Sequence, residues 1–238
     1  ADNVVTFRYV VRSIAYHKGY YATFMPKPLF GVNGSGMHSN QSLMTADGEN
    51  AFYDPASSNG LSESARYYIG GLLSHIKEFT ALTNPLVNSY KRLVPGYEAP
   101  IYLTWSDSNR SSLIRIPAAR GKGTRVELRC PDPTCNPYLA FAVMLRAGLD
   151  GIKNKIDPGE SIKRNVFELT EDERTQMGIG ALPGNLKEAT DEMKQSEFVR
   201  SALGDHVFEH YISAKTAEWD NYKARVHQWE LDTYLSIV

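Results

Sequence analysis

The sequence predicts an α+β fold that ends in a helical tail. Apolar residues recur at helical spacing near the start, in the middle and near the end of the 238-residue chain. Between these stretches lie short segments that are rich in β-compatible residues and are separated by proline and glycine. After Pro158 and Gly159 the composition shifts to charged helices, so residues 156–238 are expected to form the tail of one domain that spans residues 1–238.

Four long helices are expected. Residues 2–18 carry valine, isoleucine and phenylalanine at helical spacing. Ser62 followed by Glu63 is a typical helix start and predicts a helix to about residue 82. A third, strongly apolar helix is expected over 137–154, and a long amphipathic one over about 204–235.

Short strands are expected before residue 130, at 20–25, 37–44, 51–53, 101–105, 113–116 and 124–129. In the second of these, the strand period places His38, Asn40 and Ser42 on one face. Met37, Gln41 and Leu43 would lie on the other face.

The composition is that of a globular protein, with 42% hydrophobic and 22% charged residues. A formal net charge of −1 gives no overall field to attract nucleic acid or an anionic membrane. No stretch reaches the length of a membrane span, and the first residues do not begin a signal peptide, so a cytoplasmic location is expected. Cys130 and Cys135 do not have zinc-knuckle spacing and are expected to be free thiols.

Basic residues gather between residues 92 and 129 although the whole chain is nearly neutral, which predicts an anion site. They are Arg92, Arg110, Arg115, Arg120, Lys122, Arg125 and Arg129. In the last strand, Arg125, Glu127 and Arg129 share a face, while Val126 and Leu128 point to a core. A carboxylate between guanidinium groups suits a divalent cation beside phosphate or carboxylate oxygens, but the strand alone fits an ordinary ion-pair network slightly better.

Two loops could complete such a site. The glycine-rich segment 31–38 ends in His38, so its backbone could approach a ligand closely and its imidazole could bind a metal. A plain hairpin connection is equally compatible with this segment. The loop 94–100 is bounded by proline and carries Glu98, which could act as a base in a closing flap, or lie in a simple surface turn.

The segment His206-Val-Phe-Glu-His210 has the spacing of an inverted zinc-protease motif. The acidic residues that follow it lie on the same predicted helix, where they cannot supply the third metal ligand. Packed helix histidines are therefore the favoured interpretation of this segment.

Several segments, in order along almost the whole chain, resemble the C-terminal catalytic part of bacterial type I glutamine synthetases. They are 22–38, 84–100, 109–111, 114–117, 125–129, 131–133, 136–138 and 148–155. The resemblance implies a curved, mostly antiparallel sheet backed by helices. It also implies an ATP-dependent carbon–nitrogen ligase that forms glutamine from glutamate and ammonia.

The resemblance also implies roles for individual residues. It makes His38 and Glu127 metal ligands, and Glu98 and Arg110 catalytic groups. The residues implied to hold glutamate are Asn33, Gly34, Arg92, Glu98, Arg110 and Arg129. The residues implied to contact ATP are Asn40, Ser42, Arg110, Arg115, Lys122 and Arg125.

The implied cofactor is Mg²⁺ or Mn²⁺, with ATP as a substrate alongside glutamate and ammonium. The implied assembly is two stacked hexameric rings, with a regulator protein as a further partner and no nucleic-acid or membrane partner. Asn40 resembles the Gram-positive-like subgroup, and Phe167 stands where adenylylated members carry a tyrosine.

The family's other metal-binding glutamates and its small N-terminal β-domain precede every segment matched here. The chain is therefore expected to be truncated and to be inactive alone. Two alternatives remain: a γ-glutamyl-amine ligase on the same scaffold, and a non-catalytic fragment that acts as a structural or regulatory binding module.

Overall fold

The computed structural model describes residues 1–96, 99–107 and 109–238. Its helices are α1 (Asp2–His17), α2 (Glu63–Thr83), α3 (Ser89–Arg92), η1 (Gly121–Gly123), α4 (Pro137–Asn154), η2 (Val166–Glu168), α5 (Glu171–Gln176), α6 (Leu186–Lys194), α7 (Glu197–Leu203), α8 (Asp205–Lys223) and α9 (Gln228–Tyr234). Its strands are β1 (Ser39–Gln41), β2 (Trp105–Ser106), β3 (Ile114–Arg115) and β4 (Val126–Leu128). The predicted α+β class is confirmed.

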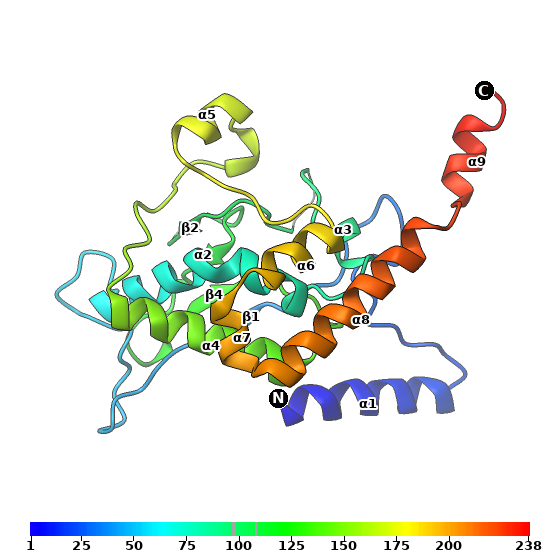
Figure 1. Cartoon of the computed structure of the whole chain (residues 1–238). Helices are drawn as coiled ribbons and strands as arrows, with labels where there is room; N and C mark the ends of the chain where they lie inside the picture. The colour runs from blue at the N-terminus through cyan, green and yellow to red at the C-terminus, as the bar shows by residue number, and fades with distance from the viewer. Residues whose placement is uncertain (97–98, 108) are drawn as a thin grey trace.

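Helices α2 and α4 form the centre of the molecule and pack closely on each other (Figure 1). The side chain of Ser62 accepts a hydrogen bond from the backbone N–H of Ala65 and begins α2, as predicted. The two helices can approach because Gly71 has no side chain at their crossing: a Cβ there would overlap the carbonyl oxygen of Ala147. The sheet and the tail are arranged around this pair.

The four strands lie in the order β1-β4-β3-β2. β4 pairs antiparallel with both β1 and β3, and β2 pairs parallel with β3, so the mostly antiparallel sheet is confirmed. In β4, Val126 and Leu128 are fully buried in the core. Glu127 points to the opposite face, as the strand period predicts.

Two strand predictions are wrong. No strand forms over 20–25, where Tyr21 is 94% exposed. In the part of the chain that the structure describes, no other strand pairs with this segment. Residues 51–53 form a turn, flanked by isolated bridges from Met44 to Asn50 and from Tyr53 to Leu61. Strands form within the ranges predicted over 37–44, 113–116 and 124–129, but only two or three residues of each pair regularly. The strand predicted over 101–105 is displaced, because β2 begins at Trp105 and ends at Ser106.

The prediction of a single long terminal helix over 204–235 is also wrong. Two helices form instead, because α8 ends at Lys223 and α9 begins at Gln228. The carboxylate of Glu230 accepts the backbone N–H of His227 at 2.7 Å, which begins a new helix. α8 itself packs on α6 and α7, with Phe208 buried beneath it.

The two end helices stand apart from this core (Figure 1). α1 has no buried residue and leaves Phe7, Tyr9 and Ile14 largely exposed. In α9, Trp229 is likewise exposed, and so is Leu235, which directly follows this helix. In the described ranges, no helix has the length and apolarity needed to cross a membrane.

Candidate active site

The centre of the candidate site is a contact between three neighbouring strand segments. Glu127 on β4 lies opposite Asn40 on β1 and Arg115 on β3. Its Oε1 is 3.1 Å from Nδ1 of His38, which immediately precedes β1. Its Oε2 is 2.6 Å from Nε of Arg115. The two predicted metal ligands are therefore in direct contact on the same face of the sheet.

The electrostatics of this contact suit a metal ligand. Burial, followed by the charge of Arg129, lowers the pKa of His38, although Glu127 acts in the opposite direction. A lowered pKa keeps the imidazole neutral, which is the form that binds metals. Oε2 of Glu127 and Nε of Arg115 are buried without hydrogen-bond geometry despite their short separation, so this carboxylate oxygen has coordination capacity to spare.

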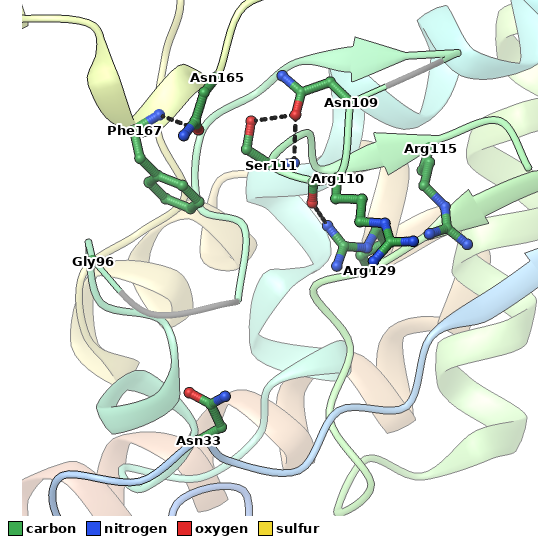
Figure 2. A pocket seen from close by; sticks show the side chains of 9 residues that line it. All are labelled: Asn33, Gly96, Asn109, Arg110, Ser111, Arg115, Arg129, Asn165 and Phe167. Atoms are coloured by element: carbon green, nitrogen blue, oxygen red, sulfur yellow. Dashed lines mark hydrogen bonds between the residues drawn. The ribbon is translucent and has the colours of Figure 1, made fainter.

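A cavity of about 840 Å³ lies next to this contact (Figure 2). It is lined by Asn33, Gly96, Asn109, Arg110, Ser111, Arg115, Arg129, Asn165 and Phe167. Figure 2 shows the guanidinium groups of Arg110, Arg115 and Arg129 gathered on one side, with Asn33 across from them. Three guanidinium groups beside one open cavity of this size favour a polyanionic ligand.

A second, small cavity of about 70 Å³ lies beside His38. Its lining is Lys27, Asn33, Gly34, Gly36, His38, Arg92, Ala99 and Arg129. Four of these residues were predicted to hold glutamate. Because Asn33 and Arg129 line both cavities, the two cavities are neighbouring parts of one candidate site.

Arg92 is buried, and its hydrogen bonds go to the backbone. Its guanidinium donates to the carbonyl of Cys130 at 2.6 Å and to that of Arg129 at 3.1 Å. Burial lowers its pKa, and the nearby charge of Asp132 partly offsets that effect. Arg92 therefore lines the small cavity and also fixes the chain just after β4.

The predicted ATP contacts on β1 face a third hollow. Asn40, Ser42 and His38 are among the lining residues of a groove of about 510 Å³ between β1 and α4. Nε of Arg125 donates to the side-chain oxygen of Asn40 at 2.9 Å, so these two predicted residues are brought together. The alternation predicted for this segment is confirmed, because His38, Asn40 and Ser42 are more exposed than the residues between them.

Two predicted site residues are not placed with the others. Lys122 lies exposed in η1 and lines none of these three hollows. η1 directly follows Arg120, whose guanidinium donates hydrogen bonds to the carbonyls of Asn59 and Pro117, outside these hollows. Glu98 lies outside the described residues, although Gly96 and Ala99 on either side of it line the large and small cavities.

Sequence reasoning assigned no site role to several residues that line the two cavities, and four of them carry larger side chains. Asn109, Asn165 and Phe167 line the large cavity, and Lys27 lines the small one. Asn88 holds Lys27 in place by bonding both its backbone N–H and its carbonyl, at 2.8 and 2.9 Å. A lysine between two prolines at the start of a glycine-rich segment was a usable signal for Lys27. The segment from 165 to 167 reaches the cavity only through the tertiary fold.

The two cysteines agree with the sequence prediction, since both are free and buried. His206 and His210 do not agree with it, because both are exposed on α8. The predicted packing of these two rings is therefore wrong. The buried residue of this helix turn is Phe208, which lies on the opposite side of α8.

Fold and site together define the chain as an α+β domain with a candidate site lined by three arginines. The family model for "Glutamine synthetase, catalytic domain" matches residues 1–234, and the chain belongs to this family.

Curated relatives named glutamine synthetase agree with this assignment. The protein from Methanosarcina mazei is 73% identical over 238 residues, which cover all of this chain and 53% of the relative. The protein from Clostridium saccharobutylicum is 60% identical over 236 residues, covering 99% of this chain and 53% of the relative. The chain thus spans about half the length of the curated relatives it matches.

A solved structure described as "GmaS/ADP complex-Conformation 1" has the same fold, with a TM-score of 0.88 and 38% identity. The match covers 99% of this chain and 54% of that one.

Proposed function

We propose that the chain forms the larger part of a glutamine synthetase active site, which joins ammonia to glutamate with ATP. The observation that carries the proposal is the His38–Glu127–Arg115 contact beside the two cavities. In this proposal the large cavity takes the phosphates and the small cavity takes glutamate. The name of the ADP-bound solved relative supports a nucleotide in this fold.

In the reaction, a γ-carboxylate oxygen of glutamate attacks the γ-phosphorus of ATP and ADP leaves. Ammonia then attacks the γ-carbonyl carbon, and phosphate leaves with the C–O bonding electrons. Guanidinium groups from Arg110, Arg115 and Arg129 would stabilise the charge on the transferred phosphoryl group. Glu98, on the loop that flanks both cavities, would take the proton from ammonium.

Mg²⁺ or Mn²⁺ is proposed as the cofactor, and His38 and Glu127 would hold it. When bound, the ion would neutralise charge on the phosphate oxygens. The fit is partial: an imidazole and a carboxylate oxygen are suitable ligands, but an octahedral shell needs about six. Among residues 1–96, 99–107 and 109–238, no group of three or more histidine, cysteine or acidic side chains is placed to hold a metal.

The proposal extends to the assembly. Two stacked hexameric rings, a regulator protein and a cytoplasmic location are proposed on family resemblance. The exposed apolar residues of α1 and α9 support association, because isolated chains rarely expose such clusters. Phe167 has no hydroxyl that could be nucleotidylated, which favours regulation through bound ligands or a protein partner.

The first test compares the chain alone with a chimera in which residues 1–238 replace the matching part of the Methanosarcina mazei relative. The chimera is expected to form glutamine from glutamate, ammonium and ATP. The chain alone is expected to form none above background with either Mg²⁺ or Mn²⁺, because too few metal ligands converge in its described part. An inactive but folded chimera would contradict the proposal, and turnover by the purified chain alone would contradict the partial metal site.

The second test uses Glu98→Ala in the active chimera. We expect glutamine formation to fall about 10²–10⁴-fold while the Kd for ADP stays unchanged, because a proton acceptor for ammonium does not touch the nucleotide. Glu49→Ala, in the exposed turn after β1, is the matched control and should keep full activity. An unchanged rate in the Glu98 variant would exclude its role. Replacing ammonium by methylamine tests the alternative γ-glutamyl-amine ligase.

A further inference from the structure

The first two turns of α8 carry a histidine pair that the proposed reaction does not use. His206 and His210 are four residues apart, so they lie on the same face of a regular helix. Both are exposed, and their ring centroids are 4.2 Å apart with the ring planes inclined by 36°. The candidate active site takes none of its lining from this helix.

A hydrogen bond sets the tautomer of one ring. Nδ1 of His210 lies 2.8 Å from the carbonyl oxygen of His206. A carbonyl can only accept, so Nδ1 carries the proton and Nε2 of the neutral ring carries the lone pair. This is the arrangement of most metal-binding histidines, in which the second nitrogen donates to a carbonyl or carboxylate.

The charges around the pair also suit a cation. The guanidinium of Arg200 contacts Asp205 at 2.8 Å and Glu209 at 3.2 Å, and it lies 4.4 Å from the ring centroid of Phe208. Its single positive charge is thus matched by two carboxylates, which leaves the local charge negative. Glu209 is already paired with Arg200, so the proposed ligands are the two imidazoles.

We propose that His206 and His210 bind one divalent transition-metal ion such as Zn²⁺. Two nitrogens bound to one ion at about 2.0–2.1 Å lie at most about 4 Å apart. The ring centroids of His206 and His210 are 4.2 Å apart, which is close to this span. Two imidazoles favour zinc, copper or nickel over magnesium or calcium, and water would fill the remaining positions.

This site differs from the protease site that the sequence spacing suggested. A catalytic zinc needs three protein ligands. Within the described ranges, no such group of three is present. The proposed site is therefore an open two-ligand site on the surface, chemically separate from the harder-ligand site proposed at His38 and Glu127.

The test titrates the complete 238-residue chain, freed of metal, with Zn²⁺ alone. Calorimetry should include a binding event that either His206→Ala or His210→Ala weakens by at least about tenfold and that His38→Ala leaves in place, because each α8 substitution removes one arm of a chelate. Long-range ¹H–¹⁵N NMR spectra of the imidazoles should show zinc bound to Nε2 of His210 with Nδ1 still protonated. Acidification should release the ion, since the ring must be neutral to bind.

Two controls separate this site from others. His17→Ala removes an exposed histidine on α1 and should leave the event unchanged. His38→Ala removes only zinc that binds in the candidate active site, so a failure of the proposed function would not affect the α8 result. The proposal is overturned if the wild-type chain binds no Zn²⁺ at millimolar concentration. It is equally overturned if the His206→Ala/His210→Ala double variant binds like the wild type.

Discussion

Arg92 connects the candidate glutamate cavity to the backbone of the sheet. Its guanidinium lines the small cavity and also donates to the carbonyls of residues 129 and 130, just after β4. The Cys130 carbonyl has a second donor, the side-chain amide of Asn84 at 2.8 Å. The hydrogen bond from Arg92 also holds the carbonyl of Arg129, whose side chain lines both cavities.

We expect Arg92→Met to lower the free energy of unfolding by about 1–3 kcal/mol, because a buried carbonyl loses a charged donor while the aliphatic packing is largely kept. Urea denaturation measures this change. Lys91→Met, at the exposed neighbouring position, is the matched control and should change stability by less than about 0.5 kcal/mol. Equal free energies of unfolding for the wild type and the Arg92 variant would show that these hydrogen bonds make no net contribution to stability.

At the scale of single residues, the alternation of β4 was predictable from the sequence. Val126 and Leu128 had to face the core, which placed Glu127 on the other side with the arginines. The backbone bonds of Arg92 and the position of Phe167 were not predictable. Both depend on contacts between segments that are distant in sequence, and spacing carries no information about them.

Among the helices, His75 joins α2 to two of its neighbours. Its Nδ1 is 3.0 Å from Oε1 of Glu78 on the same helix, and its Nε2 is 3.0 Å from Oδ2 of Asp150 on α4. Its ring stacks on Phe198 of α7, with centroids 3.9 Å apart. The Ser196 hydroxyl donates to Glu78 and caps the start of α7. A single imidazole thus holds three helices together.

The protonation of His75 controls this contact. Both ring nitrogens can donate only when the ring is charged. Burial acts to lower the pKa of His75, but its hydrogen bonds to Glu78 and Asp150 outweigh burial and raise the pKa above the ordinary 6.5. The stabilisation is therefore complete below pH 6.5 and is lost as the pH rises through the folded-state pKa. The pKa values of Glu78 and Asp150 are lowered, so their contribution is lost only in acid.

We therefore expect His75→Ala to lower the free energy of unfolding by about 1–2 kcal/mol at about pH 6, and by less at about pH 8. Denaturation at both pH values measures the difference. His17→Ala, on the exposed end of α1, should show no such dependence. A destabilisation by His75→Ala that grows between the two pH values would contradict this account.

Long helices were more predictable than strands. α2 and α4 have a side-chain cap at the start and a continuous apolar face, and both signals are local in the sequence. The strands have only two or three regularly paired residues, so their ends depend on the neighbouring strand. The segment 20–25 has β-type composition but no neighbouring strand, and composition alone cannot distinguish these cases.

Across the whole molecule, burial is uneven. Tyr68, Ile69 and Leu72 of α2 are almost fully buried, whereas α1 has no buried residue. Among the described residues, α1 is connected to the body by few polar contacts, such as the bond from Arg8 to the carbonyl of Cys135 at 3.0 Å. Local opening should therefore be much easier at the two ends of the chain than in its centre.

Hydrogen exchange followed by mass spectrometry should show this gradient. We expect amides of α1 and α9 to have protection at least about tenfold lower than those of α2 and α4, because exchange in the centre requires global unfolding. The exposed helix α5 should resemble the ends and serves as an internal reference. Protection of α1 equal to that of α2 would indicate that another chain covers it in solution.

The two faces of β4 have a consequence for how this protein tolerates mutation. Val126 and Leu128 are fully buried in the core, whereas the residue between them forms ion-pair contacts with His38 and Arg115 on the other face. A change of volume in the core moves the backbone that carries Glu127, since close-packed interiors transmit displacement. A screen for variants that displace Glu127 would therefore recover apolar positions of β4 together with the charged positions that contact this carboxylate.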